Sequence, residues 1–142
     1  SPYLYKKNLL IRQETYESSD EPVEEIVSTY NEKGQLIKVD WTSDEENFVL
    51  THTYDTYGNL TSSVKESSEG TQTNVYKYQY DNQGNILKEE FQLTSTYEDI
   101  LDYSYLKTYT YDTQGNRITE GYKVDMAFRP EIEFVEYHIE YY

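Results

Sequence analysis

Apolar and polar residues alternate along most of this chain, and short polar turns interrupt the alternation at regular intervals. In residues 75–80 a tyrosine occupies every second position from Tyr76, with Lys77 and Gln79 between the rings. A period of two places successive side chains on opposite faces of a β-strand. Residues 81–84 read Asp-Asn-Gln-Gly, which favours a type I turn with Asp first and Gly fourth. The segment is therefore predicted to begin a β-hairpin whose return strand starts at residues 86–87.

The same plan occurs four times along the chain. Aligning Tyr30, Tyr54, Tyr80 and Tyr111 gives tyrosine, Asp or Asn, two variable residues, Gly, and Asn or Gln. The tyrosines are 24, 26 and 31 residues apart, so the length varies in the connecting loops and not in the turn. In each turn the first side chain can bond a backbone N–H two residues on, and glycine is expected at positive φ. The predicted turn residues are Gly34, Asp55, Gly58, Asn59, Asp81, Gly84, Asn85, Asp112, Gly115 and Asn116.

Other alternating segments predict the remaining strands. The expected strands cover residues 9–16, 24–30, 37–41, 48–54, 75–80, 87–93, 103–111, 118–124 and 135–141, and a return strand follows the turn at 55–60. Loops are expected at 17–22, 43–47, 67–71 and 127–130, whereas residues 94–101 show no clear pattern. No window has helical periodicity. The prediction is a single all-β domain over residues 1–142, an antiparallel meander of about ten strands in a curled open sheet.

Two alternatives to the open sheet remain, a closed barrel and a two-layer sandwich. Residues 135–141 match the strand that precedes a turn, and the return strand is missing. This last strand is therefore a candidate sheet edge, and a strand-edge dimer is one possible consequence. In the barrel alternative it would instead pair with the strand at 9–16 and leave no edge.

Composition narrows the classes of partner. The chain has 18 tyrosines and a formal net charge of −15. Such a surface repels phosphate groups, so nucleic acid and anionic membranes are poor partners. There is no cysteine, which excludes disulfides, thiolate metal sites and a cysteine nucleophile within this chain. No apolar run approaches the ~18 residues of a membrane span, so none is expected.

The four turn sequences, YNEKGQL, YDTYGNL, YDNQGNI and YDTQGNR, resemble the YD repeat of the RHS family. Asn31 and Gln35 depart from the pattern in the first copy, and Arg117 replaces the aliphatic residue in the fourth. Small secreted or lipid-anchored bacterial proteins built of a few such hairpins are the nearer likeness. The resemblance implies an extracytoplasmic, non-enzymatic protein in the periplasm, on the outer surface or secreted, with a signal or lipid-attachment segment removed upstream.

Catalytic and metal chemistry have little support in the sequence. His52 and His138 are the only histidines, and each lies within an alternating strand pattern. No nucleophile elbow, zinc-protease motif or phosphate-binding glycine loop is present. Residues 24–25 and 44–46 are acidic, but they suit solvated segments, and the turns lack the alternating oxygens of a calcium loop. Asn59 is explained by its turn although it begins a glycosylation sequon. We expect no enzyme activity, metal or cofactor.

The aromatic face is the main candidate for binding. Tyrosine rings stack on sugars and peptides and offer a hydroxyl for polar contacts. Burial in a tyrosine-rich core explains the same alternation. Two function classes follow, an interaction or scaffold module that binds protein through its sheet face or edge, and a carbohydrate-binding module. The hypothetical ligand-binding residues are Trp41, Tyr76, Tyr78, Tyr80, Tyr103, Tyr105, Tyr109 and Tyr111.

Overall fold

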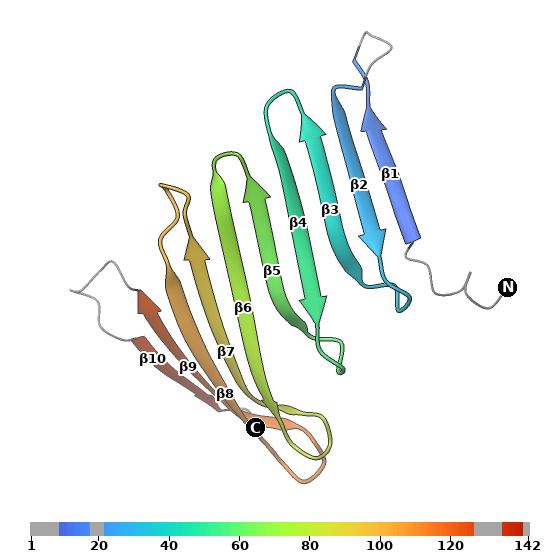
Figure 1. The fold of residues 1–142 in the computed structure, drawn as a ribbon. Coiled ribbons are helices and arrows are strands. Elements are labelled where there is room, and N and C mark those ends of the chain that lie inside the picture. The colour runs from blue at the N-terminus through green and yellow to red at the C-terminus, as the bar shows by residue number, and fades with distance from the viewer. Residues whose placement is uncertain (1–8, 18–21, 127–134, 141–142) are drawn as a thin grey trace, which may run out of the picture.

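In the computed structural model, which describes residues 9–17, 22–126 and 135–140, ten strands form one sheet (Figure 1). They are hydrogen-bonded in sequence order, each antiparallel to the next. No helix in the described part of the chain is long and apolar enough to cross a membrane. The strands are β1 (Leu9–Thr15), β2 (Glu24–Tyr30), β3 (Leu36–Ser43), β4 (Asn47–Tyr54), β5 (Leu60–Ser67), β6 (Gly70–Tyr80), β7 (Ile86–Ser95), β8 (Tyr103–Tyr111), β9 (Arg117–Met126) and β10 (Val135–Glu140).

The predicted open meander is confirmed, and both alternatives are wrong. Among the described residues β1 pairs only with β2 and β10 only with β9, so the two end strands do not meet. A barrel would require that pairing, and a sandwich would require a second sheet. The loop expected at residues 127–130 lies outside the described residues, as does the end of the last predicted strand at residue 141. Residues 94–101, for which the sequence shows no clear pattern, fall into two parts. The first two residues are the end of β7, which extends to Ser95, and the others belong to the link to β8.

The four predicted turns have the expected geometry. In the third, the Gly84 N–H donates to the Asp81 carbonyl at 3.2 Å and the Asp81 N–H donates to the Asn85 carbonyl at 2.9 Å. The Asp81 side chain accepts bonds from the N–H groups of Gln83 and Asn85 at 2.9 and 2.8 Å. The φ angles of Gly34, Gly58, Gly84 and Gly115 are +79°, +86°, +84° and +84°, so each glycine occupies the left-handed region that closes a three-residue hairpin loop.

Tyrosine hydroxyls hold neighbouring hairpins together beside these turns. The ladder between β5 and β6 begins at the Ser62–Val75 pair, so Leu60 lies beyond its end. The Tyr78 hydroxyl donates to the Leu60 carbonyl at 2.7 Å. The hydroxyls of Tyr54 and Tyr111 make the same contact with the first residues of β3 and β7, also at 2.7 Å. Each hydroxyl therefore donates to a backbone carbonyl that has no partner in the hydrogen bonds between the strands of neighbouring hairpins.

The sheet is one layer thick among the described residues, so it has almost no conventional core. Among the residues whose burial the structure describes, only Phe91 and Leu93 are buried hydrophobic residues, with exposed fractions of 5% and 7%. The chain exposes 10459 Å², whereas a compact protein of its mass exposes about 7,700 Å². Cross-strand contacts between side chains on each face therefore carry much of the stabilisation that a second layer would otherwise supply.

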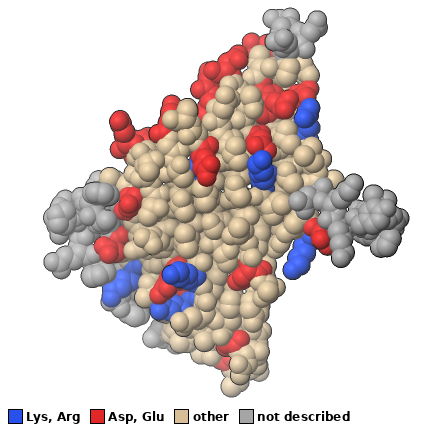
Figure 2. All heavy atoms as spheres, viewed as in Figure 1, with Lys and Arg blue, Asp and Glu red and all other residues tan. Residues whose placement is uncertain are grey.

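Charge is distributed unevenly over the molecule. Figure 2 shows acidic side chains gathered along the upper rim, where the loops that precede β4, β6 and β8 lie. Exposed acidic residues in these loops are Asp44, Glu45, Glu46, Glu69, Glu98 and Asp99. The four glycine turns form the opposite rim, so one end of every hairpin is acidic and the other is a tight polar turn.

Candidate functional site

One face of β6 to β9 carries a continuous group of aromatic side chains, here called the tyrosine face. The strand register aligns Tyr76 with Phe91 and Phe91 with Tyr105. The tyrosine face comprises Tyr76, Tyr78 and Tyr80 of β6, Phe91 of β7, Tyr103, Tyr105, Tyr109 and Tyr111 of β8, and Tyr122 of β9. Lys77 and Gln79 alternate with the β6 rings and are exposed, so the predicted division between the two faces is confirmed.

Phe91 is the centre of the ring contacts on this face. Its ring lies 4.8 Å from that of Tyr76, 4.7 Å from that of Tyr105 and 5.5 Å from that of Tyr103, between ring centroids. Tyr105 continues the series to Tyr122 at 5.6 Å. These separations are within the range of favourable offset and tilted aromatic pairs, each worth about 0.5–1.5 kcal/mol beyond burial.

At the turn rim, Tyr80 connects the tyrosine face to the preceding hairpin. Its ring stacks on Tyr57 at 4.0 Å between centroids. The Tyr80 hydroxyl donates to the Asp55 carboxylate and accepts a 2.9 Å bond from the Asn59 amide. The turn residues Asp55 and Asn59 therefore fix both their own loop and the position of a neighbouring ring.

Trp41 does not join the other predicted ligand-binding residues. Its ring stacks instead on Phe48 of β4 at 5.4 Å. Lys65 Nζ of β5 lies 4.5 Å from the centroid of the Phe48 ring. The Trp41–Phe48 pair is thus a second, smaller aromatic patch. It is separated from the rings of β6 by β5, which contributes Ser63 and Lys65 and no aromatic side chain.

The predicted aromatic residues are neither buried nor freely exposed. All eight have intermediate exposure, and the described residues provide no layer that covers them. Ring–ring contacts stabilise the sheet, as a core would, while part of each ring remains accessible to solvent. The rings therefore pack against one another and also remain partly accessible.

Sequence reasoning missed the carboxylate in this face. Glu89 lies in register between Tyr78 and Lys107, and its Oε2 accepts a 2.6 Å hydrogen bond from the Tyr105 hydroxyl. The sequence pattern could have indicated this, because Glu89 and Phe91 are two residues apart on β7 and so lie on the same face of the sheet. Lys107 Nζ lies 5.1 Å from the Tyr105 ring centroid and 5.5 Å from that of Tyr122.

The hydroxyls around Glu89 are harder to ionise than free tyrosine. Burial raises the pKa of Tyr105, and its hydrogen bond to Glu89 raises it further. Burial also raises the pKa of Tyr78, and the negative charge of Glu89 adds to the effect. These hydroxyls are therefore neutral hydrogen-bond donors at neutral pH, which suits binding and gives no nucleophile or general base.

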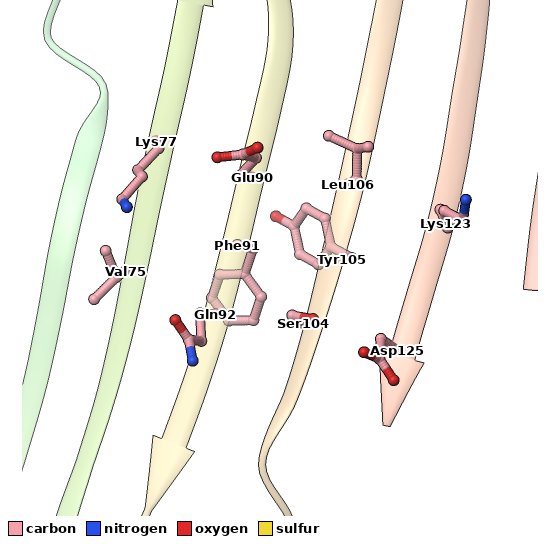
Figure 3. Close-up of a pocket in the computed structure, with 10 residues that line it drawn as sticks. All are labelled: Val75, Lys77, Glu90, Phe91, Gln92, Ser104, Tyr105, Leu106, Lys123 and Asp125. Carbon is pink, nitrogen blue, oxygen red and sulfur yellow. The ribbon is translucent and has the colours of Figure 1, made fainter. Parts of the chain in front are cut away.

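The opposite face of β6 to β9 holds a groove of about 390 Å³ (Figure 3). Two rows of aligned side chains cross it, one from Lys77 through Glu90 and Leu106 to Lys123. The other row runs from Val75 through Gln92 and Ser104 to Asp125. Glu90 is already paired with Lys88 at 2.9 Å. Phe91 and Tyr105 complete the lining of the groove, and its other side chains give it a polar surface with mixed charges.

His52 lies on β4 beside Tyr54. Its Nδ1 atom is buried without a hydrogen-bond partner, and burial lowers the pKa of the imidazole. The ring tilts against Tyr54 at 6.5 Å and lines a groove between the first two turns. The His138 side chain lies outside the described residues. Within the described ranges, no three His, Asp or Glu side chains converge in a way that could hold a metal ion.

Comparison with known proteins adds no functional assignment. No family model matches the chain, and no curated protein is similar to it at a significant level.

Proposed function

We propose that the chain is a non-enzymatic interaction module of the extracytoplasmic space that binds a protein partner through its tyrosine face. The observation that carries the proposal is the partial exposure of the rings on a sheet with no covering layer in the described residues. A sheet face rich in aromatic residues is normally buried against another layer. Tyrosine is also enriched at protein interfaces, where its ring packs and its hydroxyl bonds.

The resemblance to the YD repeat supports the same proposal. Its hairpins build extended sheets in secreted and surface proteins, and a scaffold or binding role outside the cytoplasm agrees with that setting. Localisation of the tagged full-length protein by cell fractionation tests the extracytoplasmic assignment. Recovery of that protein only in the cytoplasmic fraction would contradict the extracytoplasmic part of the proposal.

Blocking each face in turn tests the binding surface. Because the chain has no cysteine, one engineered thiol can carry a bulky label. Lys107→Cys places the label on the tyrosine face, because Lys107 pairs with Glu89 and its side chain lies over the rings of Tyr105 and Tyr122. Thr108→Cys is the matched control, because Thr108 is exposed and pairs with Lys88 on the opposite face.

The two labelled variants should differ in crosslinking-based capture of partners from extracellular extract. We expect the label at position 107 to abolish capture of the partner protein and the label at position 108 to leave capture unchanged. Equal capture by both would contradict the tyrosine face as the binding surface. Circular dichroism of both variants provides the folding control.

A carbohydrate-binding module is the second candidate. It is favoured by the strip formed by Tyr76, Phe91 and Tyr105, on which sugar rings could stack. A glycan array probed with the two labelled variants separates the candidates. Specific glycan binding that the label at position 107 abolishes would favour the carbohydrate class over the protein class.

A further inference from the structure

We infer that Glu89 and the tyrosines around it form a binding site for an arginine side chain of a basic protein segment. The inference rests on the proposed function, since it specifies the chemistry that a partner presents to the tyrosine face.

Glu89 is a partly exposed carboxylate that has no ion-pair partner among the described residues. The ion pairs among the described residues involve other carboxylates, and none includes Glu89. Its Oε2 accepts one bond from Tyr105, and no bond is made to Oε1 within the described structure. A carboxylate has about four lone-pair positions, so Glu89 retains acceptor capacity for a donor that approaches from solvent.

The rings around Glu89 favour a cation at that position. Its negative charge acts on Tyr76, Tyr78, Tyr105 and Tyr109, which places the carboxylate among four tyrosines. Aromatic faces attract cations that lie within about 6 Å of the ring centroid. Carboxylate and rings together provide the two elements that a bound organic cation needs, charge neutralisation and a flat polarisable surface.

The chain's own cations already use the rings of this face. The Arg117 guanidinium lies 4.5 Å from the centroid of Tyr109, and Lys107 lies over Tyr105 and Tyr122. Arg117 also forms an ion pair with Glu120 at 3.7 Å. It therefore contacts a tyrosine ring and a carboxylate at once, as we propose for an arginine of the partner protein. Lys107 is the one cation that faces Glu89 across the strands, and it is not within ion-pair distance of it in the described structure.

Arginine suits the site better than lysine. A guanidinium is planar, stacks on aromatic rings and donates in a fork that matches a carboxylate. An ammonium is a compact and strongly hydrated charge that makes less use of a ring face. The net charge of −15 attracts basic segments in general, and Glu89 provides the specific anchor.

The test uses a synthetic peptide of alternating arginine and glycine as the probe, with isothermal titration at moderate salt. Glu89→Gln keeps the size of the side chain and an acceptor for Tyr105 while it removes the charge. Glu90→Gln is the matched control, because it removes the same charge from the next residue of β7 on the opposite face. We expect Glu89→Gln to weaken binding about tenfold or more, as for the loss of a hydrogen bond to a charged group. Glu90→Gln should change the affinity less than about twofold, as exposed charges usually do.

Two further peptides define the chemistry. Replacing every arginine by citrulline keeps the shape and removes the charge, and should abolish binding. Replacing every arginine by lysine should weaken binding, because the planar stacking is lost. Equal effects of the Glu89→Gln and Glu90→Gln variants, undiminished binding of the citrulline peptide, or no binding by the unaltered protein would overturn the inference.

The outcome is separable from that of the proposed function. A partner captured through the tyrosine face, as judged by the label at Lys107→Cys, but bound equally well after Glu89→Gln would refute the arginine site alone. Equal capture after labelling at either position would refute the proposed binding surface itself.

Discussion

Replacing a turn glycine by alanine tests the hairpin geometry directly. Gly115 has a φ of +84°, and a Cβ atom added there meets no atom within 4 Å. The substitution therefore isolates the cost of holding a side chain in the left-handed conformation, about 1–2 kcal/mol. The smaller freedom of alanine in the unfolded chain returns about 0.4–1 kcal/mol. The free energy of unfolding should fall by about 1 kcal/mol in total.

Gly84 provides an internal comparison with the same backbone. Its φ is also +84°, but an added Cβ would lie 3.4 Å from Cε1 of Tyr57. This is an ordinary van der Waals contact, and the Tyr57 side chain is 58% exposed. Gly84→Ala should therefore cost about the same as Gly115→Ala, within a few tenths of a kcal/mol. Asparagine tolerates this conformation, so Gly115→Asn should cost less than Gly115→Ala.

Urea denaturation followed by two probes measures these changes. Trp41 in β3 is the only tryptophan, and its fluorescence reports the first half of the sheet. Far-ultraviolet circular dichroism reports all strands. Sheets built from repeats can unfold in parts, so a substitution at Gly115 should lower the circular dichroism midpoint more than the fluorescence midpoint. A neutral or stabilising Gly115→Ala would show that the glycine is not left-handed in solution, and would refute the turn assignment.

Three other predictions follow from the hydrogen bonds and pKa values. Tyr78→Phe should lower the free energy of unfolding by about 0.5–1.5 kcal/mol, measured against Tyr76→Phe as the control that removes no inter-hairpin hydroxyl bond. Bonds from Asn85 hold the pKa of Asp81 below 3.8, so its stabilisation is present above pH ~4 and is lost as pH falls through the native pKa. In acid titration Asp81→Asn should reduce that loss, because Asn31 makes the same turn in the first hairpin. Burial raises the pKa of Tyr105, so above pH ~10 ionisation in the unfolded state should lower stability, visible as tyrosinate absorbance that appears with unfolding.

Features set by neighbouring residues could be predicted from the sequence. The turns depend on a few adjacent residues, such as Asp81 and Gly84, whose backbone preferences are strong. The division of Tyr76 and Lys77 between two faces follows from the period of a strand alone. Asn31 shows how local the rule is, because it replaces Asp and still accepts the same two backbone bonds.

Features that depend on the register between hairpins could not be predicted. Loops of different length connect the hairpins, so the alignment of Phe91 with both Tyr76 and Tyr105 is a tertiary result. The same uncertainty grouped Trp41 with the tyrosines, although the structure pairs it with Phe48. Glu89 was overlooked because a carboxylate at an apolar position is noticed only when its neighbours across the strands are known.

The edge of the sheet at β1 leads to the last prediction. Leu9, Leu10 and Ile11 are 60%, 57% and 43% exposed, and in the described structure only β2 pairs with this strand. An exposed apolar edge with free backbone groups favours pairing with another strand. At high protein concentration, the amides of β1 should therefore become more protected from hydrogen exchange, through antiparallel pairing with β1 of a second copy.

Leu10→Lys should remove this concentration dependence, because a lysine on an edge strand opposes such pairing. Leu101→Lys is the matched control, since Leu101 is 40% exposed and precedes β8 outside any strand. It should leave the concentration dependence intact. Both substitutions raise the charge equally, so a difference between them cannot come from general repulsion. Protection of β1 that is independent of concentration, or that persists in Leu10→Lys, would show that this edge does not mediate self-association.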